Sequence, residues 1–177
     1  GWRFLDTGAM YRAVTLAALD RGIDASSAEL PLLLERLTID FTPQNAVMLD
    51  DRDVTQAIRS SAVTANVSRY AAVPAVRESM ATEQRRIGDH GLLVCEGRDM
   101  GTHVFPDAAV RFYLDASNRV RAERRHAELS AAGSPVPIDA LVLEIDSRDR
   151  ADSERATAPL RRIPQQIYID SSGLSQE

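Results

Sequence analysis

The stretch that decides the fold class is Leu92-Leu93-Val94-Cys95-Glu96-Gly97-Arg98-Asp99. A short, wholly apolar run of this kind is typical of a strand buried on both faces, as in parallel sheets. The charged residues and the glycine that follow would lie at the carboxyl end of the strand, where parallel sheets bind their ligands. The stretch therefore predicts an α/β fold with a binding loop at residues 96–99.

Helices and strands alternate along the rest of the chain. The apolar spacing predicts further strands at residues 4–5, 110–114 and 167–169. It predicts helices at residues 9–21, 29–37, 75–87, 117–131 and 139–156. Two alternating runs, 38–41 and 47–49, indicate a small antiparallel hairpin. This order implies right-handed crossovers and a three-layer parallel sheet flanked by helices, with the hairpin as an insert.

The expected helix ends carry recognisable signals. Ser26 has capping-box spacing with Glu29, and Ser117 and Asp139 are expected to cap the helices that follow them. Two glycines are expected to stop the helices before them, Gly22 and Gly133.

The composition excludes several classes of function. The 177 residues are 44% apolar and carry a formal charge of −5, which suits a soluble globular protein. The acidic excess argues against nucleic-acid binding, and no apolar run approaches the roughly 20 residues of a membrane span. Cys95 is the single cysteine, so no internal disulfide can form and the cytoplasm is expected. All 21 basic residues are arginine, because the chain has no lysine.

Two strand exits carry residues that suit an anion. Thr7 and Arg12 lie where a strand turns into a helix, whose free backbone N–H groups attract phosphate. From this segment alone, a plain helix cap with a solvent-facing Arg12 is the favoured reading. In the second exit, Arg98 lies between Glu96 and Asp99. Three charges at the opening of a parallel sheet favour a binding site there over a plain turn.

Two helices carry clustered arginines. One holds Arg148, Asp152 and Arg155 at spacings that share a face, and such a ladder could simply stabilise an exposed helix. The other holds three arginines whose repulsion favours a bound phosphate: Arg121, Arg124 and Arg125. A solvated face, partly neutralised by Glu123 and Glu128, stays open as the alternative.

Taken in order, four segments resemble the bacterial cytidylate kinases, which are P-loop nucleoside monophosphate kinases. The first two are Phe4-Leu5-Asp6-Thr7-Gly8-Ala9-Met10-Tyr11-Arg12 and Glu96-Gly97-Arg98-Asp99-Met100-Gly101-Thr102-His103-Val104-Phe105-Pro106-Asp107-Ala108. The others are Ser68 with Val73-Pro74-Ala75-Val76-Arg77, and Arg148-Asp149 with Asp152, Arg155, Ala156 and Ala158-Pro159-Leu160. The resemblance runs from the first residue to about Ser172.

This resemblance implies transfer of the γ-phosphoryl group of ATP to CMP or dCMP, with Mg²⁺. It implies that the acceptor phosphate is held by Thr7, Arg12, Arg98 and Arg155. It assigns cytosine recognition to Ser68, Arg77 and Asp99, and contacts with the pentose to Arg148 and Asp152. The lid over ATP would contain Arg121, Arg124 and Arg125. The arginines expected to act on the transferred phosphoryl group are Arg98, Arg155, Arg124 and Arg125. None of the histidines, His90, His103 and His126, is assigned a catalytic role.

The resemblance also divides the chain into expected parts. They are a core at 1–37, an NMP-binding insert at 38–74, core at 75–117, lid helices at 118–156, and core with the last strand at 157–177. A monomer is expected, with no nucleic-acid or membrane partner.

One motif of the family is missing. The phosphate loop G-x-x-x-x-G-K-[ST] needs a lysine, and this chain has none. We expect the loop and the first strand to precede Gly1, and little or no kinase activity if the chain begins there. Two alternatives stay open: an NMP kinase acting on UMP or AMP, and a catalytically incompetent nucleotide-binding fragment.

Overall fold

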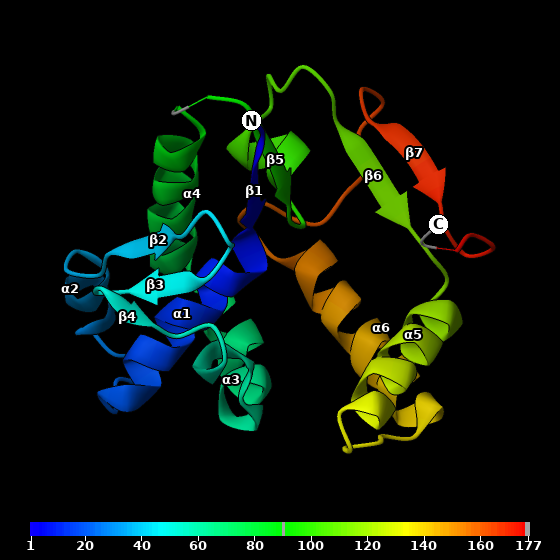
Figure 1. Cartoon of the computed structure of the whole chain (residues 1–177), viewed down its shortest axis with the longest axis horizontal. Helices are drawn as coiled ribbons and strands as arrows, with labels where there is room; N and C mark the ends of the chain where they lie inside the picture. The colour runs from blue at the N-terminus through cyan, green and yellow to red at the C-terminus, as the bar shows by residue number, and fades with distance from the viewer. Residues whose placement is uncertain (90, 176–177) are drawn as a thin grey trace. The chain divides into compact units, whose positions relative to one another are not determined.

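The structure is a computed structural model of the chain and describes residues 1–89 and 91–175. His90 lies outside the described residues. The chain divides into two compact units, Gly1–Met100 and Gly101–Glu177. Each unit has its own pair of parallel strands (Figure 1).

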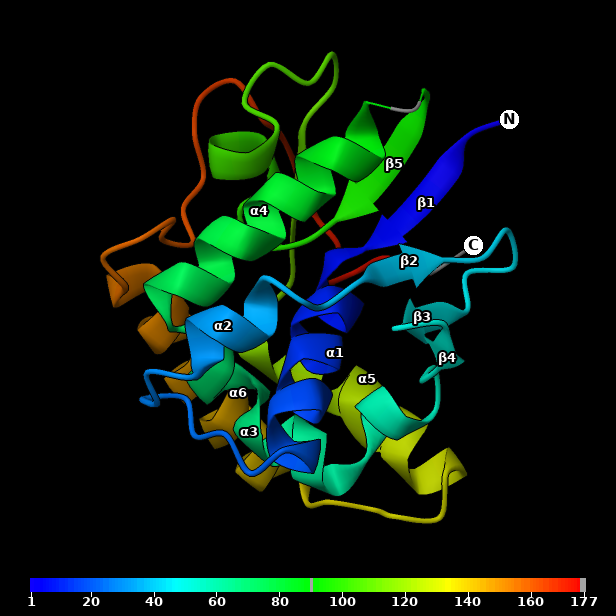
Figure 2. The same ribbon diagram turned by 90° about the vertical axis from the view of Figure 1, so that its left-hand side faces the viewer.

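The parallel sheet of the first unit joins β1 (Arg3–Asp6) to β5 (Leu93–Glu96). Its register places Phe4 opposite Val94 and Leu5 opposite Cys95. α4 (Pro74–Gly88) lies across one face of the sheet (Figure 2). The Arg3 guanidinium donates to the Ile87 carbonyl of α4, so the face that carries Arg3 and Leu5 is the one turned toward this helix.

The expectation that the apolar run around β5 is buried on both faces is wrong. Val94 is 51% exposed and its partner Phe4 is 41% exposed, whereas Leu5 is 1% exposed. Because successive side chains of a strand point to opposite faces, Phe4 and Val94 lie on a face that the helices of the first unit leave uncovered.

α1 (Thr7–Asp20) forms the centre of the first unit's core. The Asp6 carboxylate accepts a hydrogen bond from the Ala9 amide and caps the helix. At the other end Gly22 adopts a φ of 65°, and the Ile23 amide donates back to α1, which confirms the expected glycine stop. The residues expected on its core face are each 0% exposed: Met10, Val14, Ala17 and Ala18.

Two further helices of the first unit differ from expectation. α2 (Leu30–Leu34) is shorter than the expected 29–37 and has no side-chain cap. The Ser26 hydroxyl bonds to Asp24 instead, so no capping box forms. α3 (Ser61–Ala71) is not among the helices expected above, and it is rich in residues of weak helix propensity. Packing against α1 supplies the stability that α3 lacks on its own.

A three-stranded antiparallel sheet completes the first unit, in the order β2-β3-β4. β2 (Ile39–Phe41) and β3 (Val47–Leu49) occupy the two runs in which a hairpin is expected, and they pair antiparallel. β4 (Arg52–Asp53) adds a short third strand, and the 3₁₀ turn η1 (Ala57–Arg59) leads on to α3. Ile39, Val47 and Leu49 are buried and anchor this sheet to the core.

The second unit contains β6 (Phe112–Asp115), β7 (Ile167–Asp170), α5 (Asn118–Ala131) and α6 (Ile138–Glu154). A π-helical turn, η2 (Met100–Val104), crosses the boundary between the units. β6 and β7 pair in parallel, and α5 packs against α6.

The helix ends of the second unit match expectation in part. The Ser117 hydroxyl accepts from the Val120 amide and caps α5, and Gly133 follows its end with a φ of 75°. Asp139 does not cap α6 but lies in its first turn, where the helix dipole stabilises a negative charge. Its carboxylate pairs with Arg119. α6 ends at Glu154, two residues earlier than expected.

The strands of the described residues form two two-stranded parallel sheets beside the antiparallel one, rather than one continuous parallel sheet. Within residues 1–89 and 91–175, no helix combines the length and the apolar character required to cross a bilayer.

The two faces of the β1–β5 sheet provide a matched test of burial. Leu5 is 1% exposed and Val94 is 51% exposed. We expect Leu5→Ala to lower the free energy of unfolding by about 2–5 kcal/mol, and Val94→Ala by less than about 1 kcal/mol. Denaturant titration of both variants measures this. Equal losses would show that both faces are covered.

Candidate functional site

A buried ion pair lies at the carboxyl end of β5. The Arg77 guanidinium donates through Nη2 to the Asp99 carboxylate, and the two side chains are 3% and 4% exposed. Nη1 of Arg77 donates to the Ala71 carbonyl at 3.3 Å. The ring of Tyr11 lies against the same guanidinium, with its centre 5.6 Å from Cζ. Ala71, Asp99 and Tyr11 lie 6, 22 and 66 positions from Arg77 in the sequence, and the fold of the first unit gathers them around its cation.

Three elements deliver the members of this cluster. Pro74 begins α4, where its missing N–H costs nothing. Arg77 follows in the first turn of α4, and Asp99 comes from the loop after β5. Ala71 ends α3, so the negative end of that helix dipole points at the Arg77 cation. Ser68 lies on the same last turn of α3 and is exposed.

Thr7 ties the β1–α1 turn to the end of β5. Its hydroxyl donates to the Glu96 carbonyl at 2.7 Å, and Thr7 is 2% exposed. A Cβ on Gly97 would lie 2.4 Å from Thr7 Oγ1 and 2.9 Å from a Met100 carbon. Only glycine at 97 allows the two strand exits to approach this closely.

Arg12 and Arg98 lie beside these exits. Nη1 of Arg12 donates to the Ile58 carbonyl at 3.2 Å and to the Thr64 hydroxyl at 2.9 Å. The solvent-facing Arg12 favoured from its segment alone is therefore wrong, because the guanidinium is half-buried against α3 and η1. Arg98 is also half-buried.

Asp6 and Glu96 are opposite each other in the register of β1 and β5. Burial raises the pKa of the Glu96 carboxyl, and the neighbouring Asp6 charge raises it further. This carboxylate pair makes the strand exits acidic next to the arginines.

In the second unit the arginines of α5 have separate partners. Arg121 donates to the Ala116 carbonyl and to Asp149 of α6. Arg124 donates to the Ser171 hydroxyl and carbonyl at 3.1 and 2.6 Å. Arg125 pairs with Glu128, as expected for a solvated face that is partly neutralised by glutamates. Glu123 pairs with Arg119, which is not one of the three clustered arginines.

Arg155 and Asp152 form a partly buried pair at 2.9 Å, with side chains 13% and 19% exposed. Arg155 follows the end of α6 in extended backbone. It therefore does not share a helix face with Arg148 and Asp152, contrary to what the spacing predicts. Its Nε donates to the carbonyl of Ala158, which adopts a positive φ of 48°. The Arg155 side chain thus helps hold a strained turn. Arg148 lies on α6 and is exposed.

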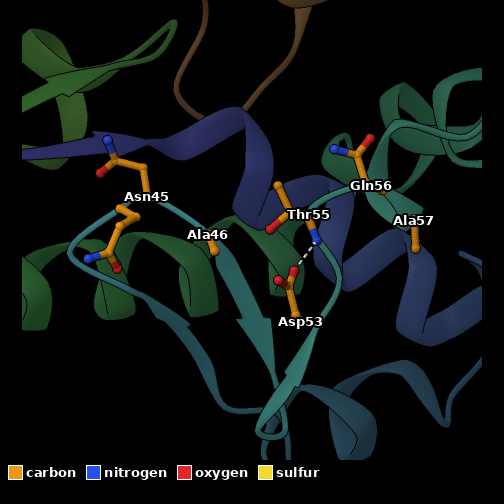
Figure 3. A pocket seen from close by; sticks show the side chains of 7 residues that line it. Asn45, Ala46, Asp53, Thr55, Gln56 and Ala57 are labelled. Atoms are coloured by element: carbon orange, nitrogen blue, oxygen red, sulfur yellow. Dashed lines mark hydrogen bonds between the residues drawn. The ribbon is translucent and has the colours of Figure 1, made fainter.

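A hollow of about 620 Å³ lies beside the antiparallel sheet, between the loop before β3 and the segment after β4 (Figure 3). Asp53 accepts from the hydroxyl and the amide of Thr55, and these hydrogen bonds lower its pKa. None of the residues predicted for the site lines this hollow, which is formed by Gln44, Asn45, Ala46, Asp53, Thr55, Gln56 and Ala57.

Tyr11 and Gln84 are among the buried side chains with polar groups to which the sequence assigns no role. Gln84 is 0% exposed on α4, seven residues after Arg77 and therefore on the same helix face. A polar residue at an apolar position of a helix is the signal that would have found Gln84. Tyr11 lies between two residues of the expected site segment, and only the fold shows which cation it meets.

Parallel strand pairs with flanking helices make this an α/β protein, consistent with the fold of the nucleoside monophosphate kinases. The family model described as cytidylate kinase matches residues 1–177. The chain belongs to the cytidylate kinase family.

Curated relatives agree with the family. A cytidylate kinase from Anoxybacillus flavithermus (strain DSM 21510 / WK1) is 46% identical over 176 residues, covering 97% of this chain and 78% of the relative. One from Geobacillus kaustophilus (strain HTA426) is 46% identical over 178 residues, covering 98% and 80%. A bifunctional pantoate ligase/cytidylate kinase from Synechococcus sp. (strain JA-2-3B'a(2-13)) is 48% identical over 180 residues. The match covers 98% of this chain and 33% of that relative, so the chain spans a third of the bifunctional protein.

The buried ion pair generates a stability prediction. Removing one partner leaves the other charge buried and unpaired, so we expect Asp99→Ala to lower the free energy of unfolding by about 3–5 kcal/mol. Asp139 pairs with Arg119 but has a side chain 91% exposed, so Asp139→Ala should cost less than about 1 kcal/mol. Denaturant titration compares the two. A small loss for Asp99→Ala would contradict the burial of the pair.

The raised pKa of Glu96 generates a pH prediction. A carboxyl with a raised pKa binds its proton more tightly in the folded state, so stability falls as pH rises from the ordinary carboxyl range through the raised pKa. We expect Glu96→Gln to raise the melting temperature near neutral pH, with the gain vanishing in acid.

Asp53→Asn is the control of opposite sign. The pKa of Asp53 is lowered, so this variant should melt below wild type near neutral pH, and the difference should shrink as the pH falls through the lowered pKa. If Glu96→Gln shifted the melting temperature equally at neutral and at acidic pH, the raised pKa of Glu96 would be contradicted.

Proposed function

We propose that this protein transfers the γ-phosphoryl group of ATP to CMP or dCMP, giving CDP or dCDP and ADP. The observation that carries the proposal is the buried Arg77–Asp99 pair at the carboxyl end of β5. Membership of the cytidylate kinase family and the names of the relatives support it.

The pair has the chemistry to select cytosine. Cytosine carries an exocyclic amino group that donates to a carboxylate, whereas uracil has a carbonyl oxygen at that position. A carboxylate acceptor would therefore attract cytosine and repel uracil. Arg77 holds the Asp99 carboxylate in a fixed direction from a rigid helix, which favours selective recognition. Ser68, on the neighbouring turn of α3, would add a hydroxyl contact to the base.

The acceptor phosphate would be bound near the turn from β1 to α1. Arg12 and Arg98 supply cationic forks, and arginine binds phosphate oxygens in two directions at once. Thr7 uses its hydroxyl to hold the Glu96 carbonyl, so its contribution to phosphate would come from the backbone at the helix start.

Phosphoryl transfer needs positioning and charge neutralisation rather than a protein nucleophile. An oxygen of the CMP phosphate would attack the γ-phosphorus of ATP while the bond to ADP breaks. In the second unit, Arg148 and Asp152 would contact the pentose and Arg155 the acceptor phosphate. Arg121, Arg124 and Arg125 would act on the ATP side, where cations stabilise charge on the transferred group.

Mg²⁺ would be held mainly through the ATP phosphates, with one or two carboxylates at most. Among the residues that the structure describes, no group of three His, Cys, Asp or Glu side chains could hold a metal ion. We expect the protein to work as a cytoplasmic monomer, without nucleic-acid or membrane partners.

Two measurements test the proposal: the selectivity of nucleotide binding, and the release of ADP during turnover. Calorimetric titration of the chain with CMP, dCMP, UMP and AMP should give the tightest binding for the two cytosine nucleotides. One lost hydrogen-bond match to a base costs about 1–3 kcal/mol, so Asp99→Asn should lose about 5–150-fold of the preference for CMP over UMP. CMP-dependent ADP release from ATP measures transfer itself.

Asp139→Asn is the matched control, because Asp139 is an exposed partner of another arginine and should leave the preference unchanged. A wild-type preference for UMP or AMP would overturn the cytosine assignment. Selective CMP binding with no ADP release would identify a nucleotide-binding chain that does not catalyse transfer.

A further inference from the structure

The Tyr11 ring lies against the side chain on which the proposed function depends. The Arg77 guanidinium carbon is 5.6 Å from the centre of this ring, and Tyr11 and Arg77 are 9% and 3% exposed. We propose that Tyr11 is a positioning residue, whose ring sets the plane of the Arg77 guanidinium for recognition of the acceptor base. This inference rests on the function proposed above and assigns that recognition a further residue.

Hydrogen bonds in the plane of the guanidinium fix only part of its orientation. Nη1 is bound to the Ala71 carbonyl and Nη2 to the Asp99 carboxylate. A planar group held at two points can still tilt about the line that joins them. A cation within about 6 Å of an aromatic ring centre is attracted to the ring face. The Tyr11 ring therefore supplies the third contact, which opposes this tilt.

The tilt decides where the remaining donor points. Nε of Arg77 is buried and has no hydrogen-bond partner within the described part of the chain. The donors of a guanidinium form a rigid planar fork, so the direction of the Nε–H bond follows the plane. A buried donor without an acceptor is unfavourable. An acceptor atom on a bound base would satisfy it only in the plane that Tyr11 maintains.

The ring itself is held by a rigid helix. Tyr11 lies on α1 between Met10, which is 0% exposed, and Arg12. Its carbonyl accepts from the Thr15 hydroxyl at 2.8 Å, and Thr15 is also 0% exposed. A ring on a buried helix keeps its position when a nucleotide binds, as a positioning residue must.

The experiment measures the ratio of the dissociation constants for UMP and CMP by calorimetric titration of the 177-residue chain. Tyr11→Phe keeps the ring and should keep the wild-type ratio. Tyr11→Leu removes the ring and should lower the ratio roughly tenfold, through weaker CMP binding. Tyr11→Met is a second ring-free variant, whose flexible side chain refills part of the space left by the ring, and it should lower the ratio to a similar extent.

Met10→Ala is the structural control, because it opens a cavity in the same helix without touching the ring. It should lower the melting temperature and leave the ratio unchanged. A ring-free variant that folds and keeps the wild-type ratio would overturn the proposal, as would an equal loss in Tyr11→Phe, since the hydroxyl would then be responsible. If wild type itself shows no preference for CMP, the proposed function fails and this inference fails with it.

Discussion

The buried pair of Arg77 and Asp99 is the constraint around which the first unit is organised. Two charges can be taken out of water only when each is closely partnered. The pair meets this condition by joining α4 to the loop after β5, with the end of α3 as a second acceptor. A few ångströms of displacement in any of these elements would leave a charge unpaired. The pair therefore stabilises the first unit only in one arrangement, the arrangement to which we assign recognition of a base in the function proposed above.

Local signals in the sequence predict most of the individual helices and strands. The cap at Ser117 and the glycine stops at Gly22 and Gly133 involve neighbours in the chain, so the sequence alone identifies them. Properties that depend on distant neighbours are not predictable in this way. The apolar run of β5 shows that its strand is apolar on both faces but not which face is covered. α3 is stabilised by packing against α1, because its own residues have weak helix propensity; its local signals are the Ser60 cap and the apolar spacing of Val63, Val67 and Tyr70.

The same distinction applies to the candidate site. Its position after a predicted strand makes Asp99 a candidate, whereas Arg12 and Arg77 are assigned to the site by the resemblance to the cytidylate kinases. The sequence does not identify their partners, since Arg12 bonds to residues 46 and 52 positions away and Arg77 to one 22 positions away. Tyr11 stands in the most recognisable segment of the chain, yet its contact with Arg77 appears only when α1 and α4 are folded together.

Several of these arginines bind main-chain carbonyl oxygens in addition to side chains. Arg12 reaches the carbonyl of Ile58, Arg77 that of Ala71, and Arg155 that of Ala158. A carbonyl oxygen is present whatever side chain its residue carries. Mutations at these acceptor positions can therefore accumulate without removing the contact, provided that the backbone keeps its path. The positions that supply only a carbonyl oxygen, Ile58, Ala71 and Ala158, should therefore vary among related proteins, while the arginines and their side-chain partners persist.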